Sequence, residues 1–441
     1  MSVSAIRGRV VTCVDDPALV GSRALVHEPD GVVVIDEGRV TTVGPAADVL
    51  PSLAPETPIA HYPGCLISPG FIDTHVHYTQ TGMVAAHGAL RPGERGAQLL
   101  DWLNRYAFPA EMRFADRAHA DAMARAFCDE LIRNGTTTAL VFCAVFPQSV
   151  NALFEEAARR NLRLIAGKVL MDRNAPDGLL DTAQSSYDQS KALIAKWHGR
   201  GRAHYAITPR FAPTSSPEQL ELAGALWAEH PDVFVHSHLS ENVDECAWVK
   251  DLFPDNDGYL DVYDSFGLTG RRAVYAHGVH LSEDELLQCH HTGTALAHCP
   301  TSNLFLGSGL FNLGTATRAD RPVHVGLGTD IGAGTSFSML ATLNEAYKVA
   351  QLTGSALDGV RGWYLATLGA ARALDLEAHI GSLQPGRDAD LIVIDPAATP
   401  LLALRTQQCE SIEELLFVLM TLGDDRVIRT TYVNGTPSPT A

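Results

Sequence analysis

The sequence predicts an α/β fold: a (β/α)₈ TIM barrel with a small β-sandwich domain built from both chain ends. Eight strand-like segments alternate with helical segments through the middle of the 441-residue chain. The interiors of these strands are mostly apolar, as in parallel sheets covered on both faces. Both ends of the chain carry short β-like runs instead. This length suits one large barrel with a satellite domain.

The two chain ends have the same sequence pattern. Residues 1–67 alternate β-like runs with turn signals and contain no convincing helix. Residues 379–441 return to that pattern, with one short helical stretch near 410–422. We therefore assign 1–67 and 379–441 to a single β-sandwich, and 68–378 to the barrel.

The middle of the chain supplies the barrel strands and helices. Ser216 and Ser282 each begin a capping-box pattern, and a helix over 118–133 is expected to end at Gly135. A doubly wound dinucleotide-binding sheet is the alternative, but the best GxGxxG candidate, at 326–332, misses its third glycine by one place. The candidate strands are 68–77, 137–143, 163–171, 204–211, 232–239, 272–278, 294–300 and 322–330.

Composition excludes several classes of protein. The sequence is 46% hydrophobic and 19% charged, which is typical of a folded globular chain. It has neither an apolar run long enough to span a membrane nor a secretory signal, and its eight cysteines form no CxxC pair, so we expect a cytoplasmic protein with reduced thiols. A net charge of −18 argues against nucleic acid and acidic membranes as partners and favours a small neutral substrate.

Ligand-type side chains gather at the predicted C-terminal ends of the strands, where barrels place their chemistry. His75 and His77 end the first strand, and alternation with period two puts both on the same face. His238 ends the fifth strand, His277 the sixth and Asp330 the eighth. An isolated HxH pair is more often two separate core histidines. Further ligand types at independent strand ends favour a metal site.

Three histidines and one carboxylate suit a borderline-soft cation. We expect His75, His77, His238 and Asp330 to hold Zn²⁺, with Fe²⁺ as the alternative. Such a metal would lower the pKa of a bound water. Glu241, three residues after His238, is placed to carry the proton of that water, although a glutamate after a strand is often only a solvated charge.

The lysines predict a single metal per chain. A second metal in this architecture is commonly bridged by a carboxylated lysine on a barrel strand. The fourth candidate strand has no lysine, and Lys168 in the third is the only strand lysine. Pairing with a carboxylate or contact with substrate are the alternatives for Lys168. Other strand histidines, including His236 and His298, are expected to have core roles.

Six segments resemble the guanine deaminases of the amidohydrolase superfamily. They are PGFIDTHVHYTQ (69–80), LLDWLNRYAFPAE (99–111), ITPRFAPTSSPEQL (207–220), HSHLSEN (236–242), AHCPTSNLFLGSGLF (297–311) and GLGTDIGAGTSFSM (326–339). The resemblance extends from about residue 60 to 435. PGFIDTHxH and GTD are common to the superfamily, whereas WLNxYxFPAE, TPRF and CPTSN are more specific.

The resemblance implies hydrolysis of guanine to xanthine and ammonia in purine catabolism, with one zinc per chain. In this family's mechanism Glu241 would shuttle the proton, Asp330 would orient the attacking water, and His277 would position the intermediate. A homodimer is the expected assembly, although the residues themselves do not determine the oligomeric state.

The resemblance also implies which residues read the purine. Gln80 and Arg210, with Phe211 beside them, match the reading positions. Arg210 can donate a forked pair of hydrogen bonds to O6 and N7 of guanine, and Gln80 can donate and accept at the ring edge. A salt bridge to an acidic residue at the barrel mouth is the alternative for Arg210. The other substrate-contacting positions implied are Trp102, Leu103, Asn104, His238 and Asp330.

Two other functions remain open at this point. A related amidohydrolase could deaminate 8-oxoguanine, cytosine or a triazine with the same metal core. A non-catalytic scaffold could keep the barrel, but such a chain should have lost ligands, and this one retains them all. The other zinc deaminase class is excluded, because the chain has neither HxE nor PCxxC.

Overall fold

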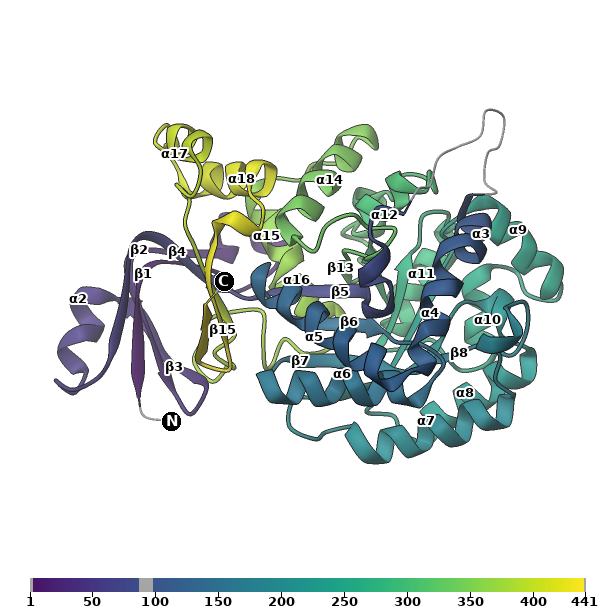
Figure 1. The fold of residues 1–441 in the computed structure, drawn as a ribbon. Coiled ribbons are helices and arrows are strands. Elements are labelled where there is room, and N and C mark those ends of the chain that lie inside the picture. Colours follow the sequence, from purple (N-terminus) through teal and green to yellow (C-terminus); the bar gives the residue numbers. More distant parts are fainter. Residues whose placement is uncertain (1–2, 87–97, 440–441) are drawn as a thin grey trace.

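The computed structural model describes residues 3–86 and 98–439 and consists of a barrel beside a smaller sheet domain. Figure 1 shows purple and yellow strands, from opposite ends of the chain, side by side in the sheet domain. The expected fold class is therefore confirmed, with both termini contributing to one satellite domain.

The satellite domain is a seven-stranded mixed sheet in the order β16-β15-β14-β4-β1-β2-β3. Antiparallel pairing of β14 with β4 joins the two chain ends. Val40 of β3 and Tyr432 of β15 share one apolar cluster although their strands lie near opposite edges, so the sheet curls over its own core. The strands are β1 (Ser4–Cys13), β2 (Leu25–Asp36), β3 (Arg39–Pro45), β4 (Ile59–Pro69), β14 (Leu391–Ile394), β15 (Ile428–Val433) and β16 (Thr436–Pro439).

The barrel is built from eight parallel strands in sequence order. Hydrogen bonds from Asp330 N to His75 O (2.9 Å) and from His77 N to Ile331 O (3.1 Å) join its first strand to the segment that follows its last strand. The predicted third strand is interrupted at Lys168, so that β8 (Val169–Leu170) pairs with β9 as a separate piece. The strands are β5 (Phe71–His77), β6 (Thr136–Phe142), β7 (Arg163–Gly167), β9 (His204–Pro209), β10 (Phe234–Leu239), β11 (Ala273–His277), β12 (Ala295–His298) and β13 (Val325–Leu327).

Helices surround the barrel; of the two expected capping boxes, that at Ser282 is complete, whereas at Ser216 only the side-chain cap forms and the Ser216 N–H donates to Asp172 instead. Ser216 accepts from the backbone of Gln219, and Ser282 forms a complete capping box with Glu285. The barrel helices are α5 (Arg117–Arg133), α6 (Pro147–Arg160), α7 (Ala183–Trp197), α8 (Pro217–Glu229), α9 (Val243–Leu252), α10 (Tyr259–Ser265), α11 (Glu283–Thr292), α12 (Pro300–Phe305), α14 (Met339–Leu352), α15 (Gly359–Ala366) and α16 (Leu368–Ala373).

The remaining α-helices of the described residues lie outside this set. They are α1 (Pro17–Val20), α2 (Ala46–Val49), α3 (Gln98–Trp102), α4 (Phe108–Met112), α13 (Leu313–Ala316), α17 (Pro400–Thr406) and α18 (Ile412–Leu422). In the part of the chain that is described, no helix has both the length and the apolar character needed to cross a bilayer.

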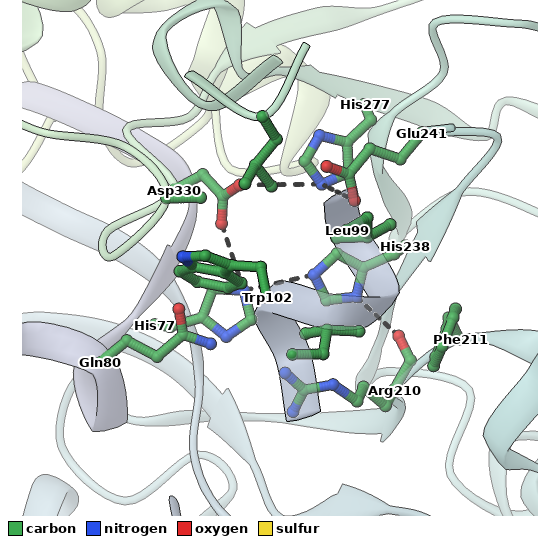
Figure 2. A pocket seen from close by; sticks show the side chains of 13 residues that line it. His77, Gln80, Leu99, Trp102, Arg210, Phe211, His238, Glu241, His277 and Asp330 are labelled. Carbon is green, nitrogen blue, oxygen red and sulfur yellow. Dashed lines mark hydrogen bonds and ion pairs between the residues drawn. The ribbon is translucent and has the colours of Figure 1, made fainter. Parts of the chain in front are cut away.

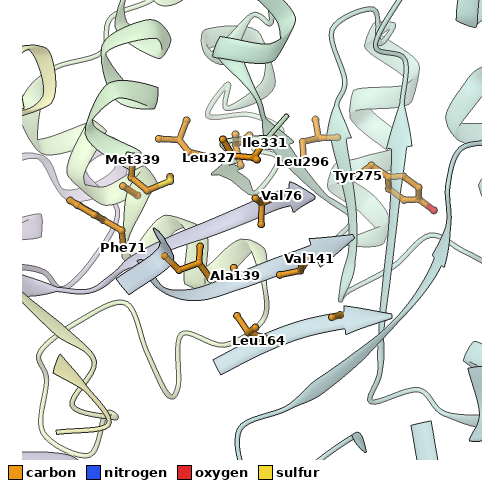
Figure 3. Close-up of a cluster of buried hydrophobic side chains, with 14 of the residues drawn as sticks. Phe71, Val76, Ala139, Val141, Leu164, Tyr275, Leu296, Leu327, Ile331 and Met339 are labelled. Carbon is orange, nitrogen blue, oxygen red and sulfur yellow. The ribbon is translucent and has the colours of Figure 1, made fainter. Parts of the chain in front are cut away.

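Alternation along the strands produces two apolar layers. In β6, Ala139 and Val141 belong to the large cluster between strands and helices drawn in Figure 3. Leu140, between them, belongs to a second cluster with Ile72 and Phe234 inside the barrel. Residues of α16 complete this inner cluster. The lower interior is therefore filled, and polar groups gather at the C-terminal ends of the strands.

Candidate active site

Four predicted metal ligands converge at the C-terminal end of the barrel. His75 and His77 come from β5, His238 from β10, and Asp330 from just after β13. Asp330 Oδ1 lies 3.1 Å from His75 Nε2 and 3.2 Å from His77 Nε2, and His77 Nε2 lies 3.2 Å from His238 Nε2. Zinc bonds of about 2.0–2.1 Å in tetrahedral geometry place ligand atoms about 3.3 Å apart. The donor set therefore fits a zinc ion.

Neighbouring groups orient two of these imidazoles. Nδ1 of His238 donates to the backbone carbonyl of Arg210 at 2.6 Å, which leaves the Nε2 lone pair directed at the cluster. Nδ1 of His75 is hydrogen-bonded to Nε2 of His236 at 2.8 Å. The sequence reasoning named no partner for His236. The alternation in His236-Ser237-His238 was the available signal, because it places both histidines on the same face.

The backbone at the strand ends is held in an uncommon conformation. His277 has φ 77° and Asp330 φ 49°, values that residues other than glycine rarely adopt. Asp73 connects the first and last strands: its carboxylate accepts from the backbone N of His75 (3.2 Å) and of Thr329 (3.0 Å) and from the Thr329 hydroxyl. These bonds hold the ligand-bearing ends of β5 and β13 together.

Burial sets the protonation of the ligands. It lowers the pKa of His77 to about 3 and that of His238 well below its usual value. Burial opposes ionisation of Asp330, but the surrounding histidines, His75 first, outweigh it and hold the pKa of this carboxyl well below its usual value. The cluster is therefore composed of neutral imidazoles and one carboxylate, the forms that bind metals.

Glu241 is a buried carboxyl beside this cluster. Ser308 Oγ donates to its Oε1 at 3.1 Å, and His277 Nε2 lies 3.5 Å from its Oε2. Burial, and then the negative charge of Asp330, raises the pKa of Glu241 to about 8. A pKa near neutrality suits a group that takes up and releases a proton. Glu245 accepts from the backbone N of Glu241 at 2.9 Å and so holds the loop that carries it.

His277 is positioned by a residue that the sequence reasoning missed. Its Nδ1 is hydrogen-bonded to Asn303 Oδ1 at 2.9 Å, and its Nε2 lies 3.8 Å from Asp330 Oδ2. Because a carboxamide oxygen only accepts, Nδ1 carries the proton and Nε2 faces the two carboxyl groups. Asn303 lies in the CPTSN segment, so a signal for it was present.

One cavity of about 390 Å³ is lined by histidines and the carboxylate of the cluster, by Glu241 and His277, and by most of the predicted substrate-binding residues. Figure 2 shows Trp102, Gln80 and Arg210 around the histidines and carboxyl groups. Asn104 does not line the cavity: it is exposed, and its Nδ2 donates to Leu100 O at 2.9 Å, because the next position along the helix turns away from Leu103. The lining residues are His77, Gln80, Leu99, Trp102, Leu103, Arg210, Phe211, His238, Glu241, His277, Leu306, Asp330 and Ala333.

Two buried basic residues have acidic partners. Arg210 forms an ion pair with Glu111, so the alternative considered for this arginine is present, yet Arg210 also lines the cavity. Lys168 is buried, its Nζ pairs with Asp181, and the same nitrogen lies 3.4 Å from Val169 O. Carboxylate pairing is thus the observed role of Lys168.

The amidohydrolase family model matches residues 66–437. The chain belongs to the amidohydrolase family. It is 54% identical over 437 residues to guanine deaminase of Escherichia coli K12, covering 98% of this chain and 97% of that protein. The solved E. coli guanine deaminase matches with a TM-score of 0.93 at 52% identity, covering 99% of each chain.

A more distant guanine deaminase has the same fold. The structure from C. acetobutylicum, with guanine bound in its active site, matches with a TM-score of 0.86 at 29% identity, covering 99% of this chain and all of that one. The resemblance expected from the six sequence segments is therefore confirmed, and this amidohydrolase is grouped with the guanine deaminases.

Proposed function

We propose that this amidohydrolase converts guanine and water to xanthine and ammonia. The observation that carries the proposal is one cavity that combines the His/Asp cluster, Glu241 and the Arg210–Gln80 pair. A relative that is 54% identical to this chain is named guanine deaminase.

One zinc ion is the proposed cofactor, with Fe²⁺ as the alternative. His75, His77, His238 and Asp330 would hold it. When bound, zinc polarises the substrate and makes a water molecule acidic enough to attack near neutral pH. The engagement of Lys168 by Asp181 supports a site with a single metal.

The chain's own residues move the proton. Glu241 accepts a proton from the attacking water and passes it to the base as the bond between C2 and the water oxygen forms. The proton of the new C2 hydroxyl is then transferred to the exocyclic nitrogen as the bond between C2 and that nitrogen breaks. Ammonia leaves, C2 becomes a carbonyl, and the proton delivered by Glu241 stays on the ring nitrogen of xanthine. Asp330 accepts a hydrogen bond from the water, and Nε2 of His277 positions the tetrahedral carbon.

Arg210 and Gln80 would recognise the purine edge. The guanidinium donates to O6 and N7, and the amide donates and accepts at the ring edge. Trp102, Leu103 and Phe211 supply apolar surface around the base. Arg210→Ala is therefore expected to lower kcat/KM for guanine, and an unchanged value would contradict this role.

A panel of bases tests the substrate assignment. Purified protein of known metal content is assayed with guanine, 8-oxoguanine, cytosine and a triazine, by ultraviolet absorbance and ammonia release. Guanine is expected to give the highest kcat/KM. No turnover of guanine together with turnover of another base would overturn the assignment, and absence of both metal and turnover would favour a scaffold.

The proposal also includes a cytoplasmic homodimer. All eight cysteines are free, which supports a reducing compartment. Light scattering after gel filtration tests the assembly, because a dimer has twice the 47.4 kDa mass of the chain.

A further inference from the structure

Glu111 lies behind the cavity wall, in α4, and its side chain is fully buried. Its carboxylate accepts from Nη1 of Arg210 at 2.9 and 2.7 Å, and from Nε2 of Gln80 at 3.2 Å. One carboxylate therefore contacts both residues proposed to read the base. Glu111 itself does not line the cavity.

We propose that Glu111 is a positioning residue that determines substrate specificity, because it sets the pattern of donors and acceptors that Arg210 and Gln80 present to the base. The inference rests on the proposed function and names a residue through which the site selects an oxopurine.

The orientation of the Gln80 amide follows from its two neighbours. Nε2 donates to the Glu111 carboxylate, which when ionised can only accept. Oε1 accepts from the backbone N of Gly332 at 3.1 Å, a group that can only donate. A flipped amide would place the Gln80 oxygen against the Glu111 carboxylate and the Gln80 NH₂ group against the N–H of Gly332. One N–H and one oxygen lone pair of Gln80 remain for a ligand.

The guanidinium of Arg210 is held by two residues of a single helical turn. Glu111 engages Nη1, and the Phe108 ring lies 5.2 Å from Cζ. Phe108 and Glu111 are three residues apart in α4, so they share one face of the helix. Nε and Nη2 of Arg210 have no hydrogen-bond partner within residues 3–86 and 98–439. Their N–H groups match the O6 and N7 acceptors of an oxopurine.

The charge of Glu111 also balances that of Arg210. The Arg210 side chain is only 2% exposed, and an unpaired cation at such a site would be strongly destabilising. As an ion pair the two groups are neutral overall, which suits a neutral base. Glu111 thus allows an arginine to serve as a buried hydrogen-bond donor.

A glutamine at position 111 cannot reproduce this pattern. If its oxygen takes the place of Oε1, it can accept from both Gln80 and Arg210, but its NH₂ group then opposes Arg210 Nη1 at the place of Oε2. In the reverse orientation the NH₂ group opposes Nε2 of Gln80. If Gln80 flips to accept from it, the Gln80 NH₂ group opposes the N–H of Gly332. Every arrangement leaves a buried donor unpaired, so Arg210 and Gln80 lose their fixed orientations.

Glu111→Gln tests the proposal with two ligands. Guanine carries an acceptor at position 6, whereas 2,6-diaminopurine keeps the 2-amino group and carries a donor there. We expect kcat/KM for guanine to fall about 10- to 100-fold, mainly through KM, as for the loss of a charged hydrogen bond. We also expect the ratio of the 2,6-diaminopurine inhibition constant to the guanine KM to move toward one, with zinc content at the wild-type level.

Two further variants separate positioning from stability. Asp181→Asn breaks the ion pair with the buried Lys168, which lies outside the cavity lining, and should lower the melting temperature without changing the ratio. Glu111→Asp keeps the charge on a side chain one methylene shorter. Its KM for guanine should lie between those of wild type and Glu111→Gln. If Glu111→Gln does not fold, a wild-type KM in Glu111→Asp overturns the inference.

The outcomes distinguish the two proposals. Wild-type protein that does not turn over guanine refutes the proposed function. Wild-type protein that does so, with a Glu111→Gln variant of unchanged ratio, refutes only the role of Glu111.

Discussion

Replacing Glu241 by glutamine removes the proposed proton carrier with little change in shape. Ser308 Oγ donates to Oε1 at 3.1 Å, a bond that a carboxamide oxygen can also accept. Because burial and then Asp330 raise the pKa of Glu241 to about 8, the carboxyl is mostly protonated at neutral pH in the isolated fold. A neutral amide therefore resembles the carboxyl of the metal-free fold in charge and shape, and the free energy of unfolding of that form should change by less than about 1 kcal/mol.

The effect on turnover should be far larger. A positioned acid–base group contributes about 10²- to 10⁴-fold to rate, equivalent to about 3–5 kcal/mol of the activation barrier. An amide cannot ionise, so we expect kcat for guanine to fall by at least about 10²-fold. Ser308→Ala, the matched control, removes only one hydrogen bond of about 1 kcal/mol and should lower kcat by less than about 10-fold.

The role of Glu241 is tested by measuring steady-state turnover of guanine and metal content in the same samples. The Glu241→Gln variant should retain the wild-type metal content and KM within a few-fold. Turnover at the wild-type rate with metal bound would remove Glu241 from the mechanism. Loss of metal together with turnover would show that Glu241 acts instead through the ligand cluster.

Three other perturbations follow from the structure. A chelator should abolish turnover, and added zinc should restore turnover and raise the melting temperature. Zinc at 1,000 times its dissociation constant adds about 4 kcal/mol to the free energy of unfolding. A melting temperature that zinc does not change would contradict the metal site. Asn303→Ala should lower kcat about 10- to 100-fold by releasing His277, with KM nearly constant, whereas a matching rise in KM would indicate a structural role. Burial, and then Glu241, raises the pKa of Glu245 to about 7, so its contribution to stability is full below about pH 4.5 and is lost as pH rises through 7. In urea unfolding, the free energy of unfolding of the Glu245→Gln variant should therefore rise relative to that of wild type between pH 5 and 8. A difference between the two free energies that does not change with pH would refute this.

Much of the candidate metal site was predictable from local pattern. His75 and His77 share a face because strands alternate with period two, and His238 and Asp330 lie at strand ends that a barrel brings together. The strand boundaries agree with the structure to within a few residues, except where the predicted third strand is interrupted at Lys168. These features depend on short stretches of chain, whose apolar alternation is visible in one dimension.

Contacts between distant segments were not predictable in this way. Glu111 lies 31 residues from Gln80 and 99 from Arg210, and no periodicity connects them. Asn104 was expected in the cavity from its neighbours in sequence, but the helical turn directs it outward. An ion pair at the barrel mouth was the alternative to base recognition for Arg210, and the structure shows an arginine that is ion-paired with Glu111 and also lines the cavity.

The sequence by itself determined the barrel, the joining of both chain ends in one domain, and the residues available to bind a metal, because hydrophobic period and strand-end position are local properties. Only the tertiary structure decided which nitrogen of His238 faces the cluster, which residue orients His277, and how Glu111 connects Arg210 with Gln80. Hydrogen-bond direction, burial and charge pairing depend on distances between side chains from separate elements, and those distances exist only in the folded chain.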